Sequence, residues 1–315
     1  MARYRDTLPQ LGGDLFLADG GLETTLIFHD GLEIPSFAAF VLLDREDGRA
    51  ALRRYYETYS SVAASHGVGM ILESLTWRAS SDWGDALGFS EEALARANRS
   101  SVELLSEVRS EAASGTGPLV ISGCLGPRAD GYRPTSVMSA GEAERYHAVQ
   151  IGTFRDTDAD LISALTMSYA DEAVGVTRAA RAAGLPVVIS FTVETDGRLP
   201  TGQTLGNAVE QVDRDTDGAP AYYMINCAHP THFEGALVPG EPWTERIRGL
   251  KVNASAKSHA ELDEAEELDD GDPVALGGQC SDIRRRFGHI NVLGGCCGTD
   301  HRHVEEIARA CLSRS

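Results

Sequence analysis

Residues 160–192 read DLISALTMSYADEAVGVTRAARAAGLPVVISFT, which is one complete strand–helix–strand unit. Apolar runs at Asp160–Thr166 and Pro186–Thr192 enclose the segment Tyr169–Ala183, whose apolar residues recur at helical spacing. The tripeptide Gly184–Pro186 marks the helix end, because glycine takes the left-handed cap and proline cannot continue the helix. Both apolar runs are nearly continuous, as in a parallel sheet that helices cover on both faces. The stretch therefore predicts an α/β protein.

The same unit recurs from one end of the chain to the other. The runs predicted as strands are Asp14–Asp19, Val68–Ser74, Pro118–Gly123, Asp160–Thr166, Pro186–Thr192, Tyr222–Cys227, Gly249–Ala254 and Ile290–Gly295. Helices predicted between them include Glu46–His66, Glu91–Ala113, Ala140–Thr157 and Tyr169–Ala183. Such a succession favours a single (β/α)8 TIM barrel over an open doubly wound sheet. No Gly-x-Gly-x-x-Gly loop follows the first strand, which argues against a dinucleotide-binding fold.

Length and composition agree with one barrel domain over residues 1–315, although at about 150 residues per domain the length would also fit two domains. With 42% hydrophobic residues the chain is globular rather than disordered.

Its 28 basic and 47 acidic residues give a net charge of −19, which repels phosphate backbones and anionic lipid, so we expect no nucleic-acid or membrane partner. An apolar run of membrane-spanning length and a signal-peptide pattern are both absent, which predicts a cytoplasmic protein. The acidic segment 259–272 is expected to be a solvated loop or helical turn on the barrel rim. The sequence does not fix the oligomeric state, and a homo-oligomer is possible.

The cysteines are too few and too irregular for a disulfide scaffold. They are Cys124, Cys227, Cys280, Cys296, Cys297 and Cys311. Catalytic groups of such barrels lie at the carboxyl ends of strands, where Cys227, Cys296 and Cys297 all fall. Adjacent cysteines on a regular strand would point to opposite faces, but the glycines at 294, 295 and 298 allow a turn that lets both sulfurs converge.

Three converging thiolates with a fourth position open are typical of a catalytic zinc site. Zn²⁺ with three thiolates carries a charge of −1, so it activates water poorly but can hold a fourth, substrate thiol as thiolate. The alternative is that Cys227 is an ordinary buried strand cysteine and Cys296 and Cys297 are a packed pair.

These residues resemble the zinc motif of the homocysteine S-methyltransferases. The resemblance rests on Asn226-Cys227 at a strand end and on the run from Gly294 to Thr299, GGCCGT. It extends to Asp19-Gly20-Gly21, to residues 123–127 (GCLGP) and to residues 190–192 (SFT), and so covers nearly the whole chain. It implies that Cys227, Cys296 and Cys297 bind Zn²⁺, and that a zinc-bound homocysteine thiolate takes a methyl group from a sulfonium or quaternary ammonium donor to give methionine. The expected partners are thus a small-molecule thiol and a methyl donor.

The candidate substrate-binding residues stand at the ends of the first, second and sixth strands. They are Asp19, Gly20, Glu73, Ser74, Trp77, Arg78 and Asn226. By the resemblance, Asp19 holds the substrate ammonium group; capping the first turn is its alternative role. Trp77 either binds a methylated cation through its ring face or packs against a rim helix, and Arg78 either binds a substrate carboxylate or is a surface arginine.

One residue departs from the family pattern. Leu165 stands where the family has a glutamate that binds the substrate amino group. Glu73 is the predicted substitute, with a structural carboxylate paired to an arginine such as Arg78 as the alternative. Leu165 also leaves two other functions open: the same zinc barrel acting on a different thiol, and a non-catalytic thiol- or zinc-binding component of a methyl-transfer system.

Overall fold

Eight parallel strands form a closed barrel in which neighbours in sequence are neighbours in space and β1 also pairs with β8. The computed structural model describes residues 2–113, 115–134, 137–264 and 267–313. The strands are β1 (Phe16–Leu17), β2 (Gly69–Glu73), β3 (Leu119–Leu125), β4 (Leu161–Met167), β5 (Val187–Phe191), β6 (Tyr222–Ala228), β7 (Ile247–Val252) and β8 (Val292–Gly295). The predicted (β/α)8 TIM barrel is confirmed, and each predicted run contains or overlaps one of these strands.

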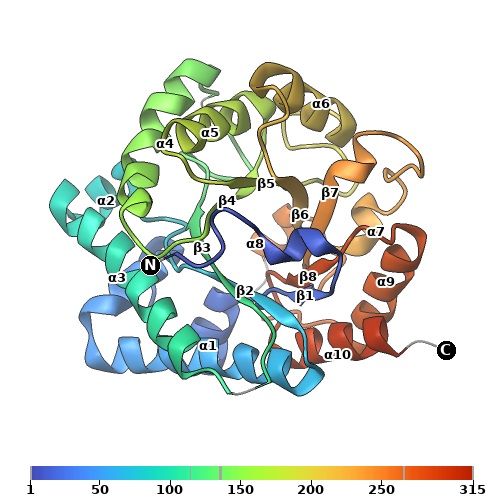
Figure 1. Ribbon diagram of the computed structural model, residues 1–315, viewed down its shortest axis with the longest axis horizontal. Coiled ribbons are helices and arrows are strands. Elements are labelled where there is room, and N and C mark those ends of the chain that lie inside the picture. Colours follow the sequence, from blue (N-terminus) through green and yellow to red (C-terminus); the bar gives the residue numbers. More distant parts are fainter. Residues whose placement is uncertain (1, 114, 135–136, 265–266, 314–315) are drawn as a thin grey trace.

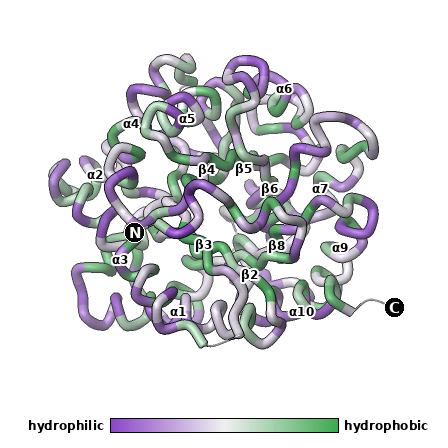
Figure 2. Tube along the Cα trace, viewed as in Figure 1, coloured by the Kyte–Doolittle hydropathy of each residue, from purple (hydrophilic) through white to green (hydrophobic). Residues whose placement is uncertain are grey.

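Helices surround the barrel and carry its hydrophilic surface (Figures 1 and 2). They are α1 (Glu46–His66), α2 (Ser81–Leu87), α3 (Glu91–Glu111), α4 (Ala140–Arg155), α5 (Ala170–Ala182), α6 (Leu205–Thr216), α7 (Pro230–Phe233), α8 (His259–Asp263), α9 (Pro273–Arg286) and α10 (His301–Leu312). Shorter turns are η1 (Pro9–Gly12), the π-helical η2 (Thr24–His29), η3 (Pro35–Phe37), η4 (Ala39–Asp44) and η5 (Thr244–Arg246). The four predicted helices end within two residues of α1, α3, α4 and α5. No helix in the described part of the chain is long and apolar enough to cross a membrane.

The barrel interior is apolar at the amino end of the strands and polar at the carboxyl end. The apolar layer includes Phe16, Val120, Leu161 and Tyr222, and Leu8 packs into it from the N-terminal segment. Figure 1 shows that segment, in dark blue, crossing the barrel opening. Two residues further along β2, β3, β4 and β5 the inward positions become Glu73, Ser122, Ser163 and Ser190. The polar layer lies directly beneath the strand ends where a TIM barrel carries its site.

The acidic segment 259–272 is partly ordered by the rest of the protein. Its first residues form α8, which Ser258 caps, and His259 is buried rather than solvated. Further on, Asp269 accepts a hydrogen bond from Ser255 and Asp270 one from Arg302. Residues 265–266 lie outside the described part. The described ends of this segment thus belong to the barrel rim beside β7 and β8.

Candidate functional site

The three predicted metal-binding thiols lie together at the carboxyl end of the barrel. Cys227 is the penultimate residue of β6, and Cys296 and Cys297 follow β8 directly. Their sulfur atoms lie within 4.8 Å of one another, and the Sγ atoms of Cys227 and Cys297 are 4.0 Å apart. Thiolates bound at about 2.3 Å to a tetrahedral Zn²⁺ would be about 3.8 Å from each other. The spacing therefore fits a tetrahedral ion with one position left for another ligand.

A tight turn after β8 directs the two consecutive cysteines to the same side. The backbone N–H of Cys296 donates to a carbonyl oxygen of β7 at 2.7 Å, and Thr299 Oγ1 donates to the Cys296 carbonyl oxygen. Gly298 has φ +78°, which other residues rarely adopt. The prediction that Gly294 and Gly295 provide similar freedom is wrong, because neither has a positive φ. They are needed for space: a Cβ on Gly295 would lie 2.1 Å from Thr299 Oγ1.

The Asn226 side chain fixes the orientation of the Cys227 sulfur. Its Oδ1 accepts hydrogen bonds from Ser190 Oγ (2.6 Å) and from the Thr166 backbone N–H (2.8 Å). Its Nδ2 donates to Thr166 Oγ1 (2.9 Å) and to Cys227 Sγ (3.2 Å). An amide has two donor hydrogens and two lone pairs, so no part of this one remains for a substrate. These contacts let the Asn226 side chain position the thiol, and the expected substrate binding by Asn226 stays a prediction.

The backbone is strained at two of the positions that Asn226 joins. Thr166 has φ 63° and Cys227 has φ 53°. Backbone in this region costs about 1–3 kcal/mol per residue and persists only where the surroundings impose it. The register of the sheet shifts at both places, between Ala164 and Met167 and between Asn226 and Ala228. These irregularities redirect the two side chains toward the mouth of the barrel, as bulges beside active sites do.

The three thiols share hydrogen bonds that favour one negative charge. Hydrogen bonds from Cys296 and Cys297 hold the pKa of Cys227 well below its usual value. The same bond raises the pKa of Cys296 to about 12, and that of Cys297 is raised as well. Because metal ligation requires all three thiolates, a divalent cation binding here would displace the protons that Cys296 and Cys297 retain.

A loop residue and α8 cover Cys227. Tyr132, on the loop between β3 and α4, lies near the Cys227 thiol and helps to lower its pKa. Its ring lies 4.1 Å from that of His259, measured between centroids. Nε2 of His259 is 2.6 Å from the Cys227 carbonyl oxygen, and its Nδ1 is 3.2 Å from Glu194 Oε1. Neither Tyr132 nor His259 was predicted at the site, because both reach it from outside the strands.

Asp19 has a cationic partner within the protein. Lys251 Nζ donates to Asp19 Oδ1, and the two side chains are 6% and 5% exposed. Burial lowers the pKa of Lys251, but the charges of Asp19 and Glu73 outweigh it and raise that pKa overall, so the amine stays protonated. Lys251 was not predicted, although a lysine inside the apolar run Gly249–Ala254 is a signal that could have identified it.

Glu73 extends into the polar layer of the barrel. Burial raises its pKa, while the charge of Lys251 and the nearby hydroxyls of Ser122 and Ser163 oppose that shift. Its Oε2 is buried and has no hydrogen-bond partner among the described residues. Ser163 precedes the irregular part of β4, in which Leu165 lies. The Glu73 carboxylate therefore lies in the polar layer near Ser163, two residues before Leu165.

Two other candidate residues are occupied by structural contacts. A Cβ on Gly20 would lie 2.3 Å from the Tyr59 hydroxyl oxygen, so this position requires glycine. Ser74 Oγ accepts from the Cys124 N–H and is 2.6 Å from Thr76 Oγ1. Because Thr76 donates to the Cys124 carbonyl oxygen, Ser74 must donate to Thr76. These contacts explain a glycine at position 20 and make Ser74 a link between β2 and β3, and substrate binding by either residue stays a prediction.

Trp77 and Arg78 lie one over the other after β2. The Arg78 guanidinium carbon is 4.1 Å from the Trp77 ring centroid, and the Trp77 Nε1–H donates to the Leu165 carbonyl oxygen at 3.4 Å. The Trp77 ring face was expected to meet either a methylated cation or a rim helix. In the structure the Arg78 guanidinium lies over this ring.

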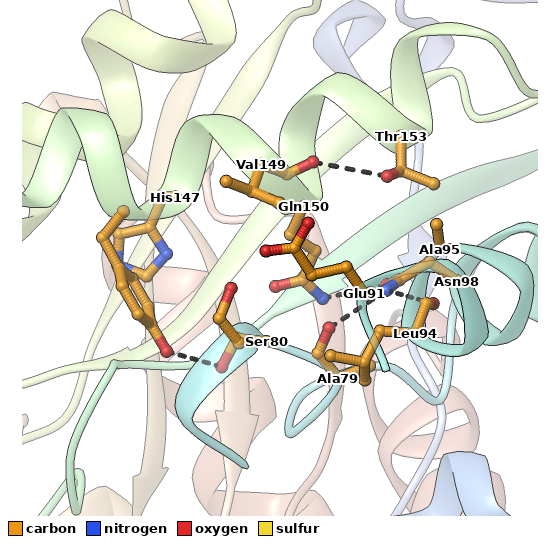
Figure 3. A pocket seen from close by; sticks show the side chains of 12 residues that line it. Ala79, Ser80, Glu91, Leu94, Ala95, Asn98, His147, Val149, Gln150 and Thr153 are labelled. Carbon is orange, nitrogen blue, oxygen red and sulfur yellow. Dashed lines mark hydrogen bonds between the residues drawn. The ribbon is translucent and has the colours of Figure 1, made fainter. Parts of the chain in front are cut away.

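A separate pocket lies outside the barrel between α3 and α4 (Figure 3). Asn98, His147 and Gln150 contribute to its lining, and Gln150 Nε2 donates to Asn98 Oδ1 at 3.0 Å. None of the three cysteines lines it. Its polar groups connect helices, and the chemistry belongs to the barrel mouth.

Comparisons with known proteins agree with this geometry. A family model described as homocysteine S-methyltransferase matches residues 16–311. The crystal structure of the homocysteine methyltransferase MmuM from Escherichia coli in its oxidized form superimposes with a TM-score of 0.75 at 19% identity, covering 94% of this chain and 96% of that one. The metallated form of the same enzyme gives 0.73 at 19% identity, covering 96% of both chains. A comparison with curated proteins finds no match.

Proposed function

Because the chain belongs to the homocysteine S-methyltransferase family, we propose that it moves a methyl group from a sulfonium or quaternary ammonium donor to the thiol of homocysteine, giving methionine. The observation that supports this most is the cluster of Cys227, Cys296 and Cys297, whose sulfurs lie within 4.8 Å at the open end of the barrel. Both expected partners are small molecules. The whole site lies within one barrel domain, proposed to span residues 1–315.

Zn²⁺ is the metal that this donor set fits, since three soft thiolates at tetrahedral spacing suit it. When bound, Zn²⁺ would stabilise the substrate sulfur as a thiolate at neutral pH. Asn226 orients Cys227 for ligation, and Tyr132 covers it. In the transfer, the substrate sulfur forms a bond to the methyl carbon while the bond from that carbon to the donor sulfur or nitrogen breaks. The donor leaves as a neutral thioether or tertiary amine.

Glu73 is proposed to hold the ammonium group of the substrate. Its unpaired Oε2 and its position near Ser163, two residues before Leu165, support this assignment. The Asp19 carboxylate is less available because Lys251 donates to it. A buried ammonium without a carboxylate loses several kcal/mol, so the site needs one such acid.

Leu165 supports a second candidate, in which the same barrel methylates a thiol that has no amino group. Glu73→Gln separates the two candidates. If Glu73 binds the ammonium group, this variant should weaken homocysteine binding at least tenfold while zinc binding stays unchanged. Unchanged homocysteine affinity would exclude the role of Glu73 and favour a different thiol.

Metal analysis and product analysis test the function itself. The protein should contain about one zinc per chain, and Cys296→Ser should lose it, whereas Cys280→Ser, at a buried cysteine of α9 outside the cluster, should keep it. A panel of S-methylmethionine, S-adenosylmethionine, betaine and dimethylsulfoniopropionate with homocysteine should yield methionine from at least one donor. A correctly folded protein without zinc would exclude the zinc mechanism, and failure of every donor would exclude methionine synthesis from this panel.

A further inference from the structure

The guanidinium of Arg78 lies over two indole rings. Its central carbon is 4.1 Å from the ring centroid of Trp77 and 3.7 Å from that of Trp83. The residue is only 6% exposed. Contacts with two rings and burial restrict the movement of the guanidinium before any ligand arrives.

Arg78 lacks the carboxylate that normally accompanies a buried arginine. Nη1 donates to the Ala129 carbonyl oxygen at 3.2 Å, and Nε is buried without a partner. Within the described ranges no carboxylate oxygen lies within 4.0 Å of the guanidinium, and Nη2 has no hydrogen bond. Burial lowers the pKa of Arg78 to about 10, so the group is still cationic at neutral pH. A buried charge without a partner is costly, and two cation–π contacts offset only part of that cost.

Contacts connect Arg78 to the thiol cluster across the barrel mouth. Trp77, which lies against Arg78, donates to the Leu165 carbonyl oxygen, and Thr166 Oγ1 of the next residue is 3.9 Å from Cys227 Sγ. Arg78 donates to the Ala129 carbonyl oxygen, and the same loop carries Tyr132, whose ring lies 4.1 Å from that of His259 beside Cys227. The unpaired cation therefore stands at the same opening as the three thiols.

We propose that Arg78 is the binding site for a carboxylate carried by one of the two substrates, an inference that rests on the proposed function. A sulfonium, quaternary ammonium or ammonium group would be repelled from this position, so the group bound here is an anion. The negative charge of Asp130 also acts on Arg78, and it disfavours a dianionic phosphate more than a single carboxylate. A carboxylate would reach Nη2, because Nη1 already donates to the Ala129 carbonyl oxygen and Nε is buried.

Pairs of ligands that differ only in the carboxylate test the proposal. In the donor arm, betaine, dimethylsulfoniopropionate and S-methylmethionine are each compared with the methyl ester. In the acceptor arm, homocysteine is compared with homocysteine methyl ester. Dissociation constants from titration calorimetry on the zinc-loaded protein should favour the free carboxylate in one arm by roughly 10- to 100-fold, the range of one charge-assisted hydrogen bond.

Variants then assign that preference to Arg78. Arg78→Met should reduce the ratio of acid to ester affinity to about 1, and Arg78→Lys should restore part of it. Arg128→Met is the matched control, because Arg128 also lies over an aromatic ring, that of Tyr146, but already pairs with Asp82. A merely structural Arg78 would alter stability and leave the ratio unchanged. The ratio is a binding measurement, so it is informative even if no methionine forms. Equal ratios for wild type and Arg78→Met in both arms would overturn the proposal.

Discussion

Asn226→Asp should sharply weaken zinc binding with little damage to the fold. The change is isosteric and keeps the Oδ1 acceptor for Ser190 and Thr166. It replaces the Nδ2 donor, 3.2 Å from Cys227 Sγ, with a carboxylate oxygen. Two unit charges at that distance repel by about 5 kcal/mol at an effective dielectric constant of 20, and a hydrogen bond to a charged sulfur is lost as well. Small movements relieve part of this repulsion. The expected loss in zinc affinity is therefore about 100-fold, near the upper end of the losses measured for residues that support metal ligands.

Competition with a chromophoric zinc chelator at pH 7.5 measures this loss. Ser190→Ala is the matched control, because it removes the neighbouring hydrogen bond to Oδ1 and leaves the contact between Nδ2 and the sulfur intact. It should retain zinc affinity within about threefold of wild type. The reasoning fails if Asn226→Asp binds zinc as tightly as wild type, or if Ser190→Ala loses as much affinity as Asn226→Asp.

Two further predictions concern buried ion pairs at opposite ends of the barrel. Lys251→Met should lower the free energy of unfolding by about 3–5 kcal/mol in urea denaturation, because it leaves Asp19 buried without its partner, and adding Asp19→Asn should recover part of that loss. The pKa of Lys251 is higher in the folded state than in the unfolded state. Its contribution to the free energy of unfolding is therefore complete below the unfolded-state pKa near 10.4 and is lost only above it. The loss of unfolding free energy in Lys251→Met should accordingly be equal at pH 6 and pH 9. Asp160→Ala should lower the free energy of unfolding by a similar amount, because the Asp160 carboxylate accepts hydrogen bonds from Arg109 and three backbone N–H groups. The zinc content of this variant should not change.

The fold was predictable because its strands are buried on both faces. Runs such as Pro186–Thr192 are continuous in sequence, and their repetition indicates the barrel without any long-range information. The meeting of Cys227 with Cys296 and Cys297 was predictable for the same reason, since parallel strands place their carboxyl ends together. Both inferences need only the identity of strand ends.

The remaining contacts depend on register and on loops. Lys251 pairs with Asp19, a residue 232 positions away, and only the closure of the barrel makes them neighbours. Glu73 meets Ser163 because β2, β3 and β4 are staggered in one particular way. Tyr132 lies on a loop that has no periodic pattern to interpret. Such contacts follow from the three-dimensional register of the sheet, which the hydrophobic pattern of the chain does not specify.

The charges in the barrel mouth support an amino-acid thiol over a simple thiol. Lys251 neutralises Asp19, Leu165 brings no charge, and burial raises the pKa of Glu23 to about 7, so Glu73 is a carboxylate of the polar layer with an unpaired oxygen. Arg78 is a cation with no carboxylate partner among the described residues. One unpaired anion and one unpaired cation beside a thiol cluster together match zwitterionic substrates. A thiol lacking an ammonium group would leave Glu73 buried and unpaired in the complex, and Arg78 would stay unpaired as well unless the donor carried the carboxylate, at a cost of several kcal/mol. Binding of homocysteine should therefore exceed that of an uncharged alkyl thiol by far more than their difference in apolar area predicts.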